Sequence, residues 1–74
     1  MRQRTFFGIF ALAEMTQREL ERWREVLDIS ARYGRVAVSP IGTIYARRFV
    51  ALGLVRTARG GFLQLTEIGE SAEI

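Results

Sequence analysis

The sequence predicts a small α+β fold in which three helices are followed by a two-stranded β-hairpin. Apolar residues recur at helical spacing in three segments, residues 5–14, 16–33 and 40–52. Beyond them, two strand-like runs flank Ala58-Arg59-Gly60, an arrangement typical of a hairpin. Because 74 residues make one domain at most, we expect residues 1–74 to fold as a single domain.

The first predicted helix, residues 5–14, is apolar on nearly all sides, and a buried strand is the alternative for this segment. One stripe at helical spacing consists of Phe6, Ile9, Phe10 and Ala13. Phe7 and Ala11 fall on another face, so we expect this helix to be covered on most sides. The cluster of phenylalanines is consistent with core packing or with a surface through which two copies associate.

The second predicted helix, residues 16–33, has the clearest local signals in the chain. Thr16 and Glu19 have the spacing of a capping box, and Gly34 is a natural stop. Met15 and Leu20 stand at the positions of a hydrophobic staple. The expected core stripe consists of Leu20, Trp23, Leu27 and Ala31, widened by Val26, Ile29 and Tyr33.

The third predicted helix spans residues 40–52, with Ser39 as its cap, Pro40 at its first position and Gly53 after its end. Its expected core side consists of Ile41, Ile44, Tyr45, Phe49 and Leu52. Its expected outward side consists of Thr43, Ala46, Arg47 and Val50. Arg48 falls at the boundary, where its stem can lie on apolar surface while its charged head reaches water.

The remaining signals predict a hairpin and a short terminal helix. Residues 54–57 and 61–65 are strand-like, and Gly60-Gly61 permits the positive φ angles of a tight turn. Residues 35–38 are extended by preference. Thr66 can cap a last helical turn, which Gly69 is expected to weaken.

The composition argues against an enzyme. The chain has no cysteine and no histidine, which removes thiolate chemistry, disulfides and the usual zinc ligands. None of its eight carboxylates stands at a spacing typical of a metal site or of an acid–base pair. We therefore expect no catalytic residue, no metal and no cofactor.

The charge is consistent with a nucleic-acid partner but does not require one. All eleven basic residues are arginines, and the formal net charge is +3 at pH 7. The planar fork of arginine suits phosphates and guanine edges.

Residues 6–13 are apolar but far too short to span a bilayer, and they lack a cleavage-like region. We expect a cytoplasmic protein with no membrane partner.

Three motifs follow one another from residue 39 onward. They are Ser39-Pro40-Ile41-Gly42-Thr43-Ile44-Tyr45, Leu52-Gly53-Leu54-Val55 and Leu65-Thr66-Glu67-Ile68-Gly69-Glu70. In this order they resemble the opening of the recognition helix, the Gly-Leu-Val that follows it, and the close of the wing in winged-helix transcription regulators of the MarR and PadR type. Residues 7–12 and 17–20 stand where those families have their first two helices.

The resemblance implies a winged helix that binds double-stranded DNA, with helix 40–52 in the major groove. Thr43 and Arg47 are then expected at base edges, and Arg48 completes a basic doublet beside them. The wing residues Arg56 and Arg59 are expected to contact phosphates or the minor groove. We expect a small transcription regulator, of phage or mobile-element origin given its size. Because a monomer this small would bind DNA weakly, we expect it to act as a homodimer.

The alternative is a protein-interaction module on the same scaffold, such as an adaptor or a phage-encoded inhibitor. Only Thr43 and Arg47 supply polar side chains to the outward side of the third helix, and acidic residues towards both ends dilute the positive charge. The spacing from Tyr45 to Gly53 is also shorter than in PadR-type helices. Because the chain ends at Ile74, we expect neither the usual dimer arm after the wing nor a ligand-sensing domain.

Overall fold

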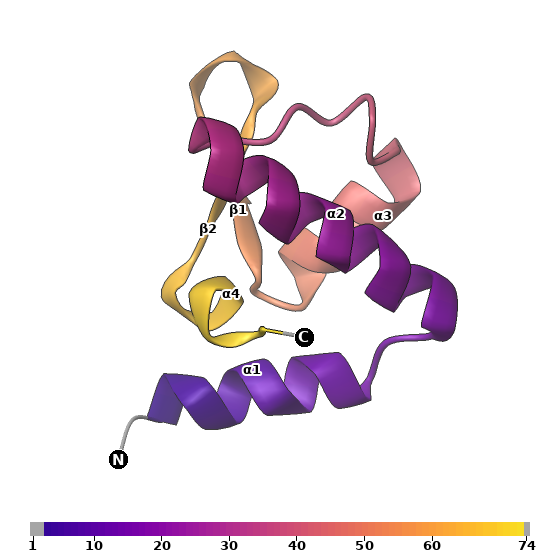
Figure 1. Cartoon of the computed structure of the whole chain (residues 1–74), viewed down its shortest axis with the longest axis vertical. Coiled ribbons are helices and arrows are strands. Elements are labelled where there is room, and N and C mark those ends of the chain that lie inside the picture. The colour runs from indigo at the N-terminus through magenta and orange to yellow at the C-terminus, as the bar shows by residue number, and fades with distance from the viewer. Residues whose placement is uncertain (1–2, 74) are drawn as a thin grey trace.

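The computed structural model describes the backbone of residues 3–73 and the side chains of residues 8–73. In chain order its elements are the helices α1 (Gln3–Ala13), α2 (Gln17–Tyr33) and α3 (Thr43–Ala51), the strand β1 (Val55–Thr57), a 3-10 turn (Arg59–Gly61), the strand β2 (Leu63–Leu65) and the helix α4 (Glu67–Ser71). The predicted α+β class is confirmed, and the arrangement is winged-helix-like. In Figure 1, α2 crosses in front of α3, and the tip of the hairpin lies far from α1 and α4. No helix in the described part of the chain is long and apolar enough to cross a membrane.

The first segment is a helix, so the strand alternative is wrong. Gly8 and Ala11 are buried, whereas Ile9 is 55% and Phe10 is 61% exposed. The expectation that this helix is covered on most sides is therefore wrong for the described side chains. The side chains of Phe6 and Phe7 lie outside the described residues.

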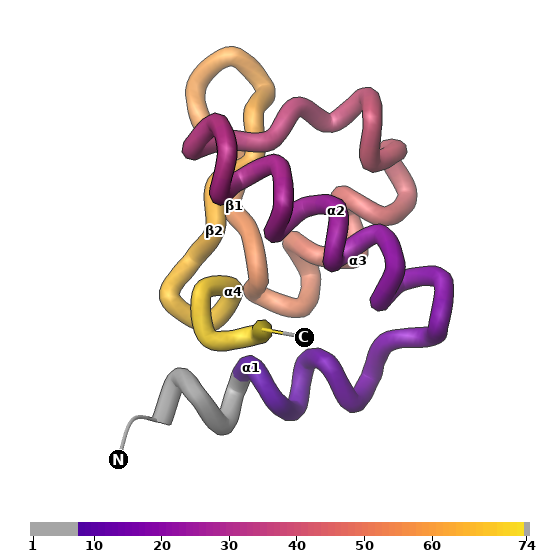
Figure 2. Tube along the Cα trace, viewed as in Figure 1, coloured from indigo at the N-terminus to yellow at the C-terminus, as the bar shows by residue number. Residues whose placement is uncertain are grey.

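Gly8 is buried because α1 lies against the C-terminal segment, as the tube in Figure 2 shows. A Cβ atom at Gly8 would lie 2.9 Å from the carbonyl carbon of Ser71 and 3.0 Å from the nitrogen of Ala72. The absence of a side chain therefore lets the two backbones approach closely. This contact joins the two ends of the chain.

Both ends of α2 form as the sequence predicts. The Thr16 hydroxyl accepts a hydrogen bond from the Glu19 N–H (3.1 Å), and the Glu19 carboxylate accepts one from the Thr16 N–H (2.9 Å). Gly34 has a φ angle of 79°, and its N–H donates to the Ser30 carbonyl (2.8 Å). The predicted stripe is right up to its last turn, where Ala31 and Tyr33 are exposed because α2 extends past the core.

The capping box gives a direct test of this helix start. Thr16→Ala removes the acceptor for the Glu19 N–H, and we expect the free energy of unfolding to fall by about 1 kcal/mol. Gln17→Ala, at an exposed neighbouring position, is the matched control and should change stability by less than about 0.5 kcal/mol. Urea denaturation followed by circular dichroism measures both variants. Equal midpoints for the two variants would contradict the capping assignment.

The core is built around Trp23 of α2. Its side chain is 0% exposed, and its ring makes an edge-on contact with the ring of Phe49 from α3 at a centroid distance of 5.2 Å. The indole N–H donates to the carbonyl of Ala72 across 2.7 Å. One side chain therefore joins α2, the helix α3 and the C-terminal segment.

The segment that follows α2 is extended, as predicted, and it pairs with the hairpin. Val36 and Leu63 exchange two backbone hydrogen bonds, with N–O distances of 2.9 and 2.7 Å. Since β2 also pairs with β1, it is bonded on both edges. The hairpin is therefore fixed to the connection between α2 and α3.

The predicted start of the third helix is wrong. Ser39 does not cap it and Pro40 is not its first residue, because residues 39–41 form a turn in which the N–H groups of Ile41 and Gly42 both donate to the Val38 carbonyl. Gly42 has a φ angle of 97°, which is incompatible with a helix, so α3 begins at Thr43.

The predicted end of this helix is right. Gly53, with a φ angle of 78°, donates its N–H to the carbonyl of Val50, and Leu54 donates to the carbonyl of Phe49. These two hydrogen bonds form a Schellman motif, and Phe49 and Leu54 are both buried beside it. The chain therefore turns sharply from α3 into β1.

Candidate nucleic-acid interface

The exposed side of α3 and the hairpin enclose a groove of about 280 Å³. It is lined by Thr43, Ala46, Arg47 and Val50 of α3 and by Val38, Thr57 and Leu63 opposite them. Thr43 and Arg47, two of the predicted site residues, are exposed on one side of this groove. Thr57 was missed by the sequence analysis, although the alternation of side chains in a hairpin could have identified it.

Two residues of α3 lie on the opposite side from the prediction. Ala46 is only 5% exposed because it lies at the floor of the groove beside the hairpin. Ile44, predicted to face the core, is 82% exposed. The inward side of α3 consists of Tyr45, Phe49 and Leu52, together with Ala46 under the hairpin, and the buried Ile41 precedes the helix.

The two arginines of the hairpin lie in different places. Thr57 pairs with Leu63, and Arg56 pairs with Gln64, so Arg56 and Thr57 point to opposite faces. Thr57 lines the groove, whereas Arg56 lies on the other face, where its guanidinium donates to the Gln64 side chain across 3.4 Å. Arg59 is exposed at the tip, in a turn that the positive φ angles of Gly60 and Gly61 make possible.

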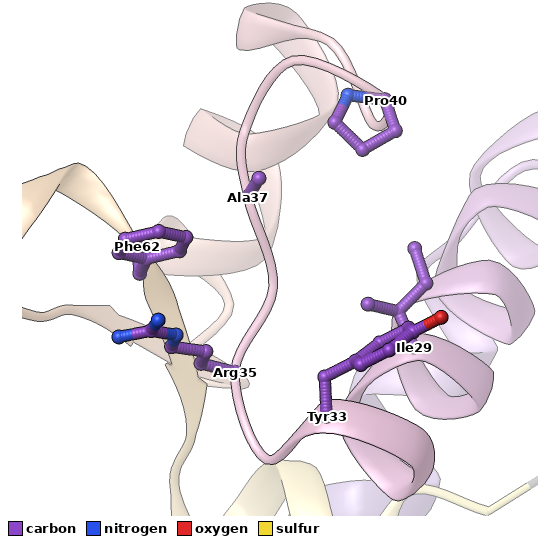
Figure 3. A pocket seen from close by; sticks show the side chains of 6 residues that line it. All are labelled: Ile29, Tyr33, Arg35, Ala37, Pro40 and Phe62. Carbon is purple, nitrogen blue, oxygen red and sulfur yellow. The ribbon is translucent and has the colours of Figure 1, made fainter.

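A cation–aromatic contact holds the hairpin from its outer face. The guanidinium of Arg35 lies 4.2 Å from the ring centre of Phe62, a geometry that attracts the cation to the ring. Figure 3 shows this pair on one wall of a shallow cleft, with Tyr33 and Ile29 on the opposite wall. Because the contact adds to the pairing of Val36 with Leu63, the wing is held in a defined position beside α3.

The structure places Arg48 away from the groove. Its Nε atom lies 3.2 Å from a carboxylate oxygen of Glu19, and one of its terminal nitrogens donates to the carbonyl of Glu14 across 3.2 Å. The Nε contact is an ion pair whose N–H does not point at the oxygen. Arg48 therefore ties α3 to the start of α2, a role that the sequence analysis did not predict.

Acidic and basic residues are distributed unevenly along the chain, which the net charge alone does not show. No Asp or Glu occurs between Asp28 and Glu67. The same stretch contains the arginines Arg32, Arg35, Arg47, Arg48, Arg56 and Arg59. By contrast, the outer side of α2 carries Glu21, Glu25 and Asp28 around Arg24. The α3 and hairpin side is therefore the basic side, and a count of acidic residues by segment would have revealed this.

Neither Arg47 nor Arg59 has an acidic partner among the described residues. Their charge is therefore not neutralised internally. No group of three or more acidic side chains in the described part of the chain could hold a metal ion. The arrangement provides cationic and hydrogen-bonding side chains beside an open groove.

Comparison with known proteins finds no family model, no curated protein and no solved structure that matches this chain.

Proposed function

We propose that this protein binds double-stranded DNA, with α3 in the major groove and the tip of the hairpin at the neighbouring phosphates. The observation that carries this proposal is the placement of Arg47 and Arg59, uncompensated by acidic residues, on α3 and on the hairpin that flanks it. The C-terminal motifs that resemble MarR-type and PadR-type regulators support the same function. A small regulator of transcription is the role that fits such binding.

The residues would act in different ways. Arg47, beside Thr43, would donate to base edges, where arginine recognises guanine. Arg59 would contact phosphates, which fix position without reading sequence. Arg48 is left out of this interface because it is engaged with Glu19, and a role for Arg56 remains a prediction from sequence.

Three variants, each of which removes one arginine charge, distinguish these roles. On a duplex enriched from a random library, we expect Arg47→Ala to cost about 1–3 kcal/mol, with a much smaller loss on unselected duplex. Arg59→Ala should weaken binding to both duplexes equally. Arg24→Ala, on the acidic side of α2, is the control and should leave both affinities unchanged. Fluorescence anisotropy measures all of these affinities.

Equal losses for Arg24→Ala and Arg47→Ala would show that binding follows net charge alone and would contradict the assigned interface.

A protein-interaction module remains the second candidate function. The observation that favours it is the exposure of Ile44 and Val50 on α3, since exposed apolar residues also suit a protein partner. Absence of binding to any duplex would select this candidate.

We also propose that two copies associate through α1. Ile9 and Phe10 are each more than half exposed on neighbouring positions of this helix, and covering them would remove apolar surface from water.

The test of this association is sedimentation equilibrium at micromolar concentration. We expect a dimer for the unchanged chain and a monomer for Ile9→Glu. Ile44→Glu places the same charge at an exposed isoleucine on α3 and should remain dimeric. A monomeric unchanged chain, or a dimer that survives Ile9→Glu, would contradict the proposal.

A further inference from the structure

We propose that α3 reads thymine through the C5-methyl groups of the major groove, using Ile44 and Val50 on either side of Arg47. This inference rests on the proposed DNA-binding function and deepens it. The base that Arg47 reaches would then be flanked by thymine-containing base pairs. The same contacts would make binding weaker when uracil replaces thymine.

The placement of these side chains carries the inference. Residues three apart on a helix are neighbours on its surface, so Ile44 and Val50 lie one turn before and one turn after Arg47. Ile44 is 82% exposed and Val50 is 42% exposed. Both are apolar, and they lie beside an arginine that has no acidic partner among the described residues.

The spacing matches stacked base pairs. A step of three residues advances about 4.5 Å along a helix, while consecutive base pairs of DNA are about 3.4 Å apart. Apolar side chains that flank Arg47 are therefore about one base pair away from the base that it reaches. Thymine is the base that presents a methyl group in the major groove, and apolar side chains contact that methyl.

The local charge favours a DNA edge over an apolar protein as the partner of this strip. Single exposed isoleucines are ordinary on protein surfaces. Here, however, the strip lies within the stretch from Asp28 to Glu67 that has no acidic residue between its ends, and Val50 also lines the groove beside the hairpin. DNA is a polyanion that presents thymine methyl groups in its major groove, so it complements both the positive charge and the apolar side chains of this strip.

The test uses alternating d(GT)·d(AC) and d(GA)·d(TC) duplexes, which place thymine next to guanine on the same strand or on the opposite strand. Each duplex is prepared with thymine or with uracil, and affinity is measured by fluorescence anisotropy. We expect at least one thymine duplex to bind about four-fold more tightly for each methyl that is buried. The double variant Ile44→Ala/Val50→Ala should bring the thymine-to-uracil ratio close to one. Arg47→Ala should weaken binding to both forms and leave the ratio unchanged.

Equal binding of thymine and uracil forms would overturn this inference while leaving the DNA-binding function intact. A preference that persists unchanged in the double variant would also overturn it, because the preference would then come from DNA shape. Absence of binding to every duplex at low salt would overturn the proposed function itself. Alanine favours a helix, so we expect the double variant to remain folded, and circular dichroism is the check.

Discussion

Trp23→Ala is expected to lower the free energy of unfolding by about 3–5 kcal/mol. The substitution empties the space beside Phe49, removes the edge-on ring contact, and leaves the buried carbonyl of Ala72 without its hydrogen-bond donor. A domain of this size has roughly 4–11 kcal/mol of stability in total. The variant should therefore lose a large part of this free energy of unfolding, and the contact between α2 and the C-terminal segment should be lost.

Two further variants separate the causes of this loss. Trp23→Phe keeps an aromatic ring but removes the N–H donor, so we expect a smaller loss of about 1–3 kcal/mol from the unpaired Ala72 carbonyl. Tyr33→Ala removes an aromatic ring from the same helix at a position that is 73% exposed, and it should cost less than about 0.5 kcal/mol. Urea denaturation followed by circular dichroism compares all three. An unchanged midpoint for Trp23→Ala would show that the packing side of α2 is wrong.

Gly69→Ala is the second large effect, and its sign separates tertiary packing from helix propensity. A Cβ atom on Gly69 would overlap the carbonyl oxygen of Leu54, well inside van der Waals contact. Leu54 is buried, and its carbonyl also accepts a hydrogen bond from the Thr66 N–H (3.0 Å), so this backbone has no room to move. We expect a loss on the order of 3 kcal/mol.

Helix propensity alone predicts the opposite result for this variant, a gain of up to about 1 kcal/mol when alanine replaces glycine. Glu70→Ala, at the next residue of α4 and exposed, is the control and should have little effect. Thermal or urea denaturation of the two variants decides between the predictions. A stabilised Gly69→Ala would show that α4 does not pack closely against the start of β1.

Local signals in the sequence predict this fold best where the stabilising contact is itself local. The capping box of Thr16, the stop at Gly34 and the cap at Thr66 depend on residues three or four positions away, and all three form as predicted. The hairpin is also predicted correctly, because its turn requires the glycines at positions 60 and 61.

The errors arise where distant segments meet. Gly69 was expected to weaken α4, and the sequence could not show that its missing side chain also allows close contact with Leu54. Ala46 was placed outward because helical periodicity cannot show that the hairpin covers it. Helical periodicity also could not reveal that Arg48 pairs with Glu19 across the fold. Within the candidate site, the sequence analysis correctly placed Thr43 and Arg47 on the exposed side of α3. It did not predict that Arg56 lies away from the groove.

The most direct test of the central claim is the salt dependence of binding to unselected duplex DNA. If each copy neutralises about three phosphates, log affinity should fall against log salt with a slope of about −2.7, which is roughly a 40-fold loss between about 50 and 200 mM salt. Arg59→Ala should flatten this slope by about one unit, whereas Arg24→Ala should leave it unchanged. Absence of binding at about 50 mM salt, or an affinity that does not depend on salt, would contradict the claim that α3 and the hairpin form a DNA-binding surface.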